Sequence, residues 1–524
     1  MKLESILLFQ LLVLLLISLK FISSAKEIKN ILLFSFPGGK SHSFIFKELF
    51  DFTAKRLEQE NPELEYKFHV IIHNYDMELW ENKNYTIYGF GNKDEYEDKF
   101  EKALEMVRED PVLGYNNFNK AMVHLNEDFL KDNIIDKLRK VKFDLILSDV
   151  VNFITPFLRS ELKIEKCIYL NPTCVFTWLF KAFEYNASYH PVIGTRFTEL
   201  MNFYERFVNQ LYLYGTKISY MYFEFTQSAP FREYGYTMEL NPFPTDVLFL
   251  NQCVDGVHYS YSLPPNILNT GAILPKPAMP LKESQLNDFL NKHESNIYVS
   301  QGTITKILNI DVLYEVFNTF PQFGFVLSLK REIIANVKTI PKNVLLLEWV
   351  NQNDLLGDDR IKMFITHGGV NSILESLYHA KPMIVIGTGI DQVNGAVVAE
   401  YRKYGKGISR NSDITLENLI SFIGEVMSNP IYKENVLFAQ KLVREKNGKE
   451  TFYYWLNYTL EYGYKHLLVP AYTKYSIIEL YNLDVILILV VLLYILFKLF
   501  MVGLIGLYKR IFKENSTTDK NKID

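Results

Sequence analysis

The sequence predicts an α/β protein with two doubly wound, Rossmann-like domains and, near the C-terminus, one helix long enough to span a membrane. Three observations support this prediction. Apolar stretches typical of buried strands alternate with helical stretches in the first half of the chain, the alternation restarts after a proline-spaced segment, and a long apolar run follows. A length of 524 residues leaves room for two or three domains.

The first predicted domain covers residues 26–273. It opens with a buried strand at residues 31–36, which a turn joins to a helix at residues 43–60. The strand pattern recurs at residues 68–72 and 145–147, each bordered by helical stretches. Doubly wound sheets bind ligands beyond the carboxyl ends of their strands, so we expect the loops there to carry binding residues.

Aromatic side chains crowd the segment between about residues 176 and 225, where the strand pattern fades. We expect a helical insertion in this segment. The whole chain holds 34 Tyr and 39 Phe. These side chains either line a cavity for an apolar ligand or belong to an ordinary core or a membrane-facing surface, and both interpretations stay open.

A proline-spaced stretch begins the predicted linker, residues 274–290, and a second doubly wound domain is predicted over residues 291–470. The strands expected in this domain lie at residues 296–300, 324–329, 344–347, 363–366 and 383–386. Two such domains that face each other across a cleft suit a substrate made of two parts.

The N-terminus has the three-part layout of a secretory signal peptide. Lys2 is followed by an apolar stretch at residues 6–19 and by small residues up to Ala25. We predict that residues 1–25 are removed by cleavage near Ala25. The alternative is an uncleaved anchor, but the apolar run is short for a bilayer, which needs about 20 residues.

Residues 485–507 form the predicted transmembrane helix, and residues 508–524 the cytosolic tail. On insertion scales, Lys498 costs about 3 kcal/mol at the centre of the span, which the surrounding apolar side chains can offset. Lys509 and Arg510 follow the span, as the excess of positive charge on the cytosolic side requires. We expect a single-pass type I protein with a lumenal body. Its last five residues resemble a dilysine retrieval signal, which indicates the endoplasmic reticulum membrane.

Charge, sequons and cysteines give further information about partners and modifications. The formal net charge is only -4 and both signs are mixed along the chain, which argues against nucleic acid. Sequons at Asn84, Asn186 and Asn457 predict glycosylation in the lumen. Three cysteines allow one disulfide at most, and no cysteine–histidine spacing predicts a metal site.

Residues 364–375 hold the densest set of candidate binding residues. A predicted strand ends in His367, Gly368 and Gly369, and a helix is expected to begin near Asn371. Glycines let the backbone approach a ligand, and the free amides at a helix start bind anions, so we expect a diphosphate there. Glu375, one turn into the helix, is placed to accept hydrogen bonds from ribose hydroxyls.

Two further pairs flank this segment. Asp391 and Gln392 follow the next strand and can hold the hydroxyls of a sugar, while Trp349 can stack on a base, with Gln352 three residues on. The ordinary structural alternatives are a capping role for His367, a solvated helix face for Glu375 and a core position for Trp349. The joint spacing of these residues favours the binding interpretation.

With these residues the sequence resembles the UDP-glycosyltransferase family, the group that includes the animal UDP-glucuronosyltransferases. The resemblance runs from residues 349–356 through His367 and Glu375 to Asp391 and Gln392, and extends over nearly the whole chain. It implies the GT-B fold, in which the first domain binds the acceptor and the second binds the nucleotide sugar. It implies no cofactor beyond UDP-glucose or UDP-glucuronate as co-substrate, and it is compatible with a homo-oligomer.

The resemblance also assigns roles to individual residues. It implies that Trp349 stacks on uracil and that Gln352 and Glu375 hold the ribose. The diphosphate contacts fall to His367, Gly369, Asn371 and Ser372, the sugar contacts to Asp391 and Gln392, and a position near the phosphates to Ser300.

The same resemblance implies that His42, after the first strand, is the general base. Histidine suits this role because its pKa lies near neutrality. Asp149 matches the carboxylate that orients the histidine and stabilises its charged form. The expected reaction is a single displacement that inverts the sugar carbon. The chain has no Asp-x-Asp pair, which agrees with a metal-independent site.

Departures from the family pattern bear on the substrates. Members that use glucuronate often carry an arginine in a Phe-Pro-Arg-Pro stretch, but residues 259–266 contain no arginine, which favours UDP-glucose. Asn351 and Gly387 stand where the family commonly has proline and are expected only to bend loops. The expected acceptor is a small apolar molecule with a hydroxyl. The alternatives are a membrane lipid of the sphingolipid type as acceptor, or a non-catalytic relative that binds nucleotide sugar or apolar ligands.

Overall fold

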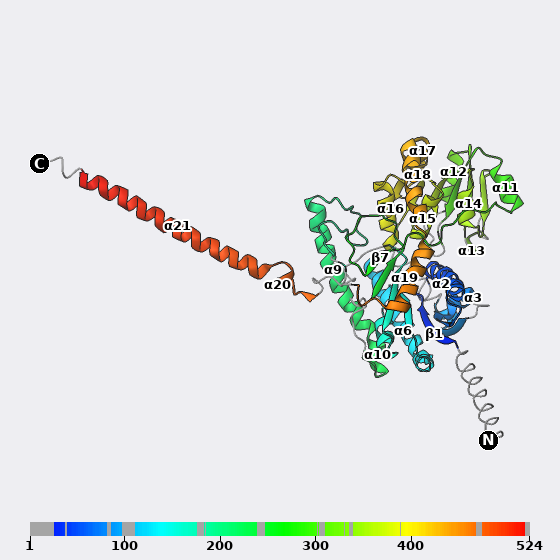
Figure 1. Cartoon of the computed structure of the whole chain (residues 1–524). Coiled ribbons are helices and arrows are strands. Elements are labelled where there is room, and N and C mark those ends of the chain that lie inside the picture. Colours follow the sequence, from blue (N-terminus) through cyan, green and yellow to red (C-terminus); the bar gives the residue numbers. More distant parts are fainter. Residues whose placement is uncertain are drawn as a thin grey trace, which may run out of the picture. The chain divides into compact units, whose positions relative to one another are not determined.

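Two parallel β-sheets and one long C-terminal helix dominate the computed structural model of the chain (Figure 1). The structure describes residues 26–36, 39–80, 85–96, 111–174, 183, 185–237, 247–300, 302, 310–329, 331–334, 339–387, 389–467 and 474–518. The chain divides into two units, one that ends at Leu468 and one that begins at Val469. The predicted signal peptide, residues 1–25, lies outside the described residues.

The first sheet has seven parallel strands in the order β3-β2-β1-β4-β5-β6-β7. They are β1 Glu27–Phe34, β2 Leu64–His73, β3 Tyr85–Phe90, β4 Leu145–Asp149, β5 Lys166–Asn171, β6 Leu248–Asn251 and β7 Ile267–Asn269. The order reverses between β1 and β4, which pair in register from Ile31 with Leu145 to Phe34 with Ser148. This is the switch point where ligands of open α/β sheets bind.

Helices cover both faces of this sheet because successive strand residues point to opposite sides. Ile31 and Leu33 of β1 pack with α2 Lys40–Glu60, whereas Leu32 and Phe34 pack on the other face. The helices between β2 and β7, besides the short 3-10 turn Asn74–Asp76, are α3 Met77–Trp80, α4 Lys93–Tyr96, α6 Pro111–Lys131, α7 Ile134–Leu138, α8 Thr155–Glu161, α9 Phe203–Gln227 and α10 Ala229–Glu233.

The second sheet has six parallel strands in the order β10-β9-β8-β11-β12-β13. They are β8 Ser295–Ser300, β9 Phe323–Ser328, β10 Val344–Leu347, β11 Ile361–Thr366, β12 Met383–Ile386 and β13 Gly405–Ile408. Its switch point lies between β8 and β11, where Ser300 pairs with Thr366. Both sheets therefore confirm the predicted doubly wound architecture.

The helices around the second sheet follow the same alternation. They are α11 Ser284–Leu290, α12 Ile310–Thr319, α13 Arg331–Ile334, α14 Gln352–Gly357, α15 Val370–Tyr378, α16 Ile390–Tyr401, α17 Leu416–Ser428 and α18 Pro430–Glu445. The predicted linker, residues 274–290, has no helix or strand before α11, and backbone amides of Lys276 and Met279 donate to Asn353 and Asp354.

Helix α19, Gly448–Tyr462, returns from the second sheet to the first. Its Phe452, Tyr453 and Leu456 belong to the same buried cluster as Ile31 and Leu33 of β1. The sequence predicts that this helix belongs to the second domain. A helix near residue 450 has no sequence feature that indicates which sheet it covers. The predicted domain limits stay predictions.

The aromatic segment between residues 176 and 225 is helical in its second part. Residues 175–182 and 184 lie outside the described residues, residues 185–202 form turns and irregular structure, and α9 follows. A disulfide joins Cys174 after β5 to Cys253 after β6, which agrees with the predicted limit of one bridge. Cys167 on β5 is buried and takes no part in this bridge.

The C-terminal unit holds α20 Ile477–Leu480 and α21 Leu483–Thr518. Within α21, the stretch Leu483–Arg510 contains an 18-residue window with a mean hydropathy of 3.1, so this helix is long and apolar enough to cross a membrane. The predicted span of residues 485–507 falls inside it. The helix continues into the predicted cytosolic tail as far as Thr518, and residues 519–524 lie outside the described residues.

Candidate functional site

His42 and Asp149 meet at the switch point of the first sheet. His42 lies in the first turn of α2, which follows β1, and Asp149 is the last residue of β4. The two atoms His42 Nδ1 and Asp149 Oδ2 are 2.6 Å apart. The His42 side chain is 17% exposed and that of Asp149 is fully buried. The carboxylate accepts, so Nδ1 carries the proton and Nε2 is left as the basic nitrogen.

The surroundings of this pair fix its geometry. Asp149 Oδ1 accepts a hydrogen bond of 2.9 Å from the Val151 amide, so both oxygens of the carboxylate are held. The Phe36 ring lies 5.8 Å from the His42 ring, centroid to centroid. Gly39 caps α2, and a Cβ there would come within 2.9 Å of Phe36 Cδ1. Glycine therefore lets the Phe36 ring pack closely beside the histidine.

The pKa of His42 lies above its ordinary value. Burial lowers the pKa, but the charge of Asp149 and its hydrogen bond raise it, and the charge of Asp391 raises it further. Asp391 lies in the first turn of α16 and belongs to the second sheet. Two carboxylates, Asp149 of the first sheet and Asp391 beside the second sheet, thus raise the pKa of the same imidazole.

The loop after β11 brings His367 against two backbone segments. Gly368 has a φ of +90°, which favours glycine. A Cβ on Gly369 would lie 2.8 Å from His367 Nε2, and a Cβ on Gly302 would lie 2.6 Å from His367 Cε1. Only glycine lets these two segments, after β11 and after β8, approach the ring this closely.

Helix α15 begins at Val370 with Gly369 as its N-cap, close to the start predicted near Asn371. Its first amides have no partner inside the helix, so they and the helix dipole form a potential anion site. Ser300 ends β8 beside Thr366, and its hydroxyl lies 3.4 Å from the Gly302 amide. The residues predicted to contact a diphosphate therefore come from the carboxyl ends of two neighbouring strands.

Glu375 and Gln352 form a buried pair. Gln352 begins α14, and its Nε2 donates to Glu375 Oε2 at 2.5 Å and to Ser372 Oγ at 3.1 Å. Burial raises the pKa of Glu375 to about 7, although the hydrogen bond from Gln352 and the charge of Lys276 act to lower it. The solvated helix face considered for Glu375 is therefore wrong, because this residue is only 9% exposed.

Trp349 lies on the surface, with 74% of the residue exposed. The core position considered for this residue is wrong. A large aromatic ring that is this exposed gains nothing from packing, and its faces are open to a planar ligand. Gln392, in the first turn of α16, accepts a hydrogen bond of 3.3 Å from the Gly389 amide.

Gln252 links the two halves of the body and was not predicted. It follows β6, is fully buried, and donates through Nε2 to Asn371 Oδ1 at 2.6 Å and to the Pro172 carbonyl at 3.3 Å. The first turn of α15 is thus tied to the first sheet. The one signal in the sequence is its place at the end of a strand.

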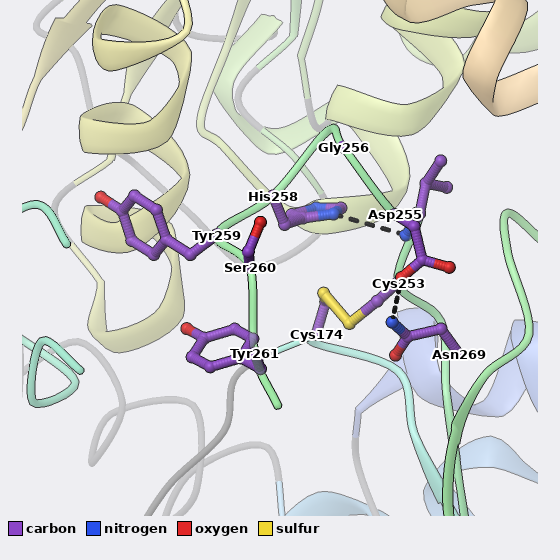
Figure 2. A pocket seen from close by; sticks show the side chains of 10 residues that line it. Cys174, Cys253, Asp255, Gly256, His258, Tyr259, Ser260, Tyr261 and Asn269 are labelled. Carbon is purple, nitrogen blue, oxygen red and sulfur yellow. Dashed lines mark hydrogen bonds between the residues drawn. A yellow bond between two sulfur atoms is a disulfide. The ribbon is translucent and has the colours of Figure 1, made fainter. Parts of the chain in front are cut away.

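A cavity of about 190 Å³ lies elsewhere, beside the Cys174–Cys253 disulfide (Figure 2). Its wall includes Tyr259, Ser260 and Tyr261, which belong to the stretch where an arginine was sought. His258 also faces it, and burial lowers the pKa of His258 to about 4. Neither His42 nor Glu375 lines this cavity.

The predicted modification sites differ in their surroundings. Asn186 is exposed in a turn, whereas Asn457 is half-buried on α19 and its sequon threonine, Thr459, is buried. Asn84 lies outside the described residues. Among the described residues no group of three or more His, Cys, Asp or Glu is arranged to hold a metal ion.

Comparisons with known proteins agree with this fold. The family model for UDP-glucuronosyl and UDP-glucosyl transferase matches residues 49–517. The chain is 27% identical over 398 residues to UDP-glucuronosyltransferase 2B23 of Macaca fascicularis, covering 71% of this chain and 70% of the relative. It is 26% identical over 434 residues to the human UDP-glucuronosyltransferase 2B17, covering 79% and 77%. It is 30% identical over 319 residues to the UDP-glycosyltransferase UGT4 of Dactylopius coccus, covering 57% and 60%.

Two solved structures are similar in fold. The glycosyltransferase of kitacinnamycin matches with a TM-score of 0.59 at 17% identity, covering 83% of this chain and all of the other. The spinosyn forosaminyltransferase SpnP matches with a TM-score of 0.55 at 14% identity, covering 82% and 99%. At these identities the likeness concerns the fold alone, and it confirms the GT-B expectation.

Proposed function

Because the chain belongs to the family of UDP-glucuronosyl and UDP-glucosyl transferases, we propose that it transfers a hexosyl group from a UDP-sugar to a hydroxyl of a small apolar acceptor, with inversion at the sugar carbon. The observation that carries this proposal is the hydrogen bond between His42 and Asp149 at the switch point of the first sheet. A histidine held by a buried carboxylate is the arrangement that a general base needs.

The chemical step follows from this pair. His42 Nε2 takes the proton of the acceptor hydroxyl as that oxygen forms a bond to the anomeric carbon. The bond from the anomeric carbon to the diphosphate oxygen breaks, and UDP leaves with the electron pair. Asp149 stabilises the imidazolium that forms, and the amides at the start of α15 stabilise the charge that develops on the diphosphate.

Different residues bind the uracil, the ribose, the diphosphate and the sugar of the UDP-sugar. Trp349 stacks on uracil, and the pair of Gln352 and Glu375 holds the ribose hydroxyls. The diphosphate lies against His367, Gly369, Asn371, Ser372 and Ser300, and the sugar against Asp391 and Gln392. The influence of Asp391 on the pKa of His42 supports this division, because an electrostatic effect of this kind needs the carboxylate to lie close to the base.

UDP-glucose is the proposed donor. Arg402 lies next to the segment without an arginine, residues 259–266: it donates to the carbonyl of His258, just before that segment, at 2.7 Å and lies 3.8 Å from Glu199. A guanidinium engaged in this way is poorly placed to pair with the carboxylate of glucuronate. The proposed site needs no metal, so excess EDTA should leave turnover unchanged.

We propose a lumenal active site in the endoplasmic reticulum membrane. Lys509 and Arg510, at the end of the span, support a cytosolic C-terminus. Glycans on Asn186 that endoglycosidase H removes, and that are lost in Asn186→Gln, would support this orientation. A chain that carries no glycan and whose body is digested by protease in sealed microsomes would contradict it.

The central test measures turnover of the purified full-length chain with UDP-glucose and, separately, UDP-glucuronate, against a panel of phenols and steroids. His42→Ala should lose roughly 10²–10⁴-fold in kcat while it still binds UDP. His293→Ala is the matched control, because this half-buried histidine precedes β8 at the opposite end of the second sheet.

The outcomes separate the alternatives. Glycosides formed only from ceramide-like acceptors would favour the lipid transferase, and tight UDP binding without transfer to any acceptor would favour the non-catalytic relative. Turnover that survives His42→Ala would overturn the assignment of the base. Preference for UDP-glucuronate would overturn the proposed donor.

A further inference from the structure

Helix α9 carries a row of large apolar side chains on the face that points to solvent. Seven residues of its outer face repeat every three or four positions, which places them on one stripe. They are Phe203 (77% exposed), Phe207 (56%), Leu211 (53%), Tyr214 (56%), Ile218 (69%), Met221 (68%) and Phe225 (64%). Figure 1 shows α9 as a long helix at the outside of the body. A stripe of this kind is the pattern of a buried helix face, but here it points to solvent.

The inner face buries two amides, Asn209 and Gln227, beside the apolar Leu213 and Phe223. Asn209 is fully buried and its side chain bonds to the backbone of Ala187, His190 and Val192. Gln227 is 2% exposed and bonds to the side chains of Asn119 and Asn126. These satisfied buried amides fix the rotation of the helix, so the apolar stripe cannot turn inward without leaving them unpaired.

The exposed stripe therefore requires a partner outside the body. Monomeric proteins rarely expose a continuous apolar surface of this kind, and such surfaces mark protein or membrane interfaces. Tyrosine and phenylalanine supply four of its seven residues, and Tyr204, Tyr212 and Tyr222 are exposed beside it. Rings with an apolar body and a polar tip are typical of residues at the boundary between lipid and water.

The covalent chain favours lipid as the partner. Residues 469–482 connect the body to α21, and a connection of this length spans about 50 Å at most. If α21 crosses a bilayer, the body therefore stays within this distance of its surface at every moment. We propose that the outer stripe of α9 lies in the lipid–water interface of this bilayer, parallel to its plane, as a second attachment of the protein to the membrane.

The proposal can be tested with spin labels on the full-length chain in phosphatidylcholine nanodiscs that hold one copy each. A nitroxide is placed on Phe225→Cys or, as matched control, on Phe438→Cys of α18. The two phenylalanines are 64% and 63% exposed on helices of the same body. Collision with oxygen, which concentrates in lipid, is compared with collision with a water-soluble nickel chelate.

We expect an oxygen-to-nickel ratio several-fold higher at position 225 than at position 438, and a similarly high ratio with Ile218→Cys as a second site. Equal ratios would overturn the proposal, because the stripe would then face water. A label at position 225 that is shielded from both reagents only in discs with two copies, with short spin–spin distances, would also overturn it and would assign the stripe to self-association.

Discussion

At the scale of single residues, the pairing of His42 with Asp149 makes a prediction about pH. A general base acts when unprotonated, so kcat/KM should rise as the pH rises through the pKa of His42. Asp149 raises that pKa. We therefore expect Asp149→Asn to move the acidic limb of the pH profile to lower pH and to lower the plateau by roughly 10²–10⁴-fold. An acidic limb that stays in place would assign it to another group.

We predict that the charge of Glu375 lowers the stability of the fold but strengthens the binding of UDP. Its folded pKa, about 7, is above its ordinary value, so the ionised carboxylate destabilises the fold, and this cost is complete above pH 7. Glu375→Gln keeps the acceptor for Gln352 and removes the charge. It should raise the free energy of unfolding by about 1–3 kcal/mol at pH 8, with little effect near pH 4.

The same substitution should weaken UDP binding at pH 8, because the ribose hydroxyls lose a charged acceptor. Urea unfolding at the two pH values and calorimetric titration with UDP measure the two effects. A variant that is less stable than the parent at pH 8 would contradict the pKa argument. A more stable variant with unchanged UDP affinity would leave the carboxylate without its proposed role at the ribose.

Residues of the candidate site differ in how far the sequence could predict them. Trp349, Gln352 and Glu375 lie within 27 positions of one another, so their spacing is visible as a pattern. His42 and Asp149 are 107 positions apart, and only the resemblance to a family linked them before the structure brought them to 2.6 Å. Gln252 has no pattern, because a buried amide at a strand end is distinguished only by the partner across the interface.

At the scale of elements, the first turn of α15 depends on Gln252. Gln252→Ala removes the hydrogen bond to Asn371 and leaves a partly buried acceptor without this donor, which should cost about 1 kcal/mol of stability. We expect UDP affinity to fall as well, because Asn371 loses the bond that orients it. Thermal unfolding with and without UDP measures both quantities.

A double substitution provides the control for this contact. If Gln252 acts through Asn371, the effects of Gln252→Ala and Asn371→Ala on UDP affinity will not add, because either change breaks the same bond. Strictly additive effects would show that the two side chains contribute separately.

Strands β13 and β7 were not predicted because neither has an apolar run long enough to recognise. Strands β10 and β12 match their predicted limits, since four consecutive apolar residues bounded by polar residues, or by a proline and a glycine, mark a buried strand. Strand β13 contains two glycines in four residues, and a Cβ on Gly405 would lie 1.6 Å from the Met383 carbonyl oxygen. Because the backbones pack closely there, the strand contains glycines in place of the large apolar residues by which a buried strand is recognised. Strand β7 has only three residues, too few for a pattern.

At the scale of the whole molecule, α9 lies between the exposed apolar stripe on its outer face and the proposed active site. On its inner face, Phe223 lies 4.8 Å and Tyr220 6.2 Å from the ring of Phe153, four residues after Asp149. Phe223 and Phe36 belong to one buried cluster, and Phe36 packs beside His42. A helix whose outer face rests in lipid would therefore have its inner face in the apolar wall beside the base. Acceptors dissolved in the bilayer would then be presented directly to this wall.

This arrangement predicts how charge on the stripe affects different acceptors. Leu211→Glu combined with Ile218→Glu places two carboxylates on the lipid-facing side, which the interface disfavours. With nanodisc-bound enzyme, we expect the apparent KM for steroids that partition into lipid to rise several-fold, while kcat and the KM for a water-soluble phenol stay unchanged. Phe438→Glu on α18 is the matched control and should alter neither KM. Because the proposed base and donor residues are untouched, a fall in kcat for both acceptors would indicate damage to the fold, whereas unchanged constants for steroids would mean that acceptors arrive through water.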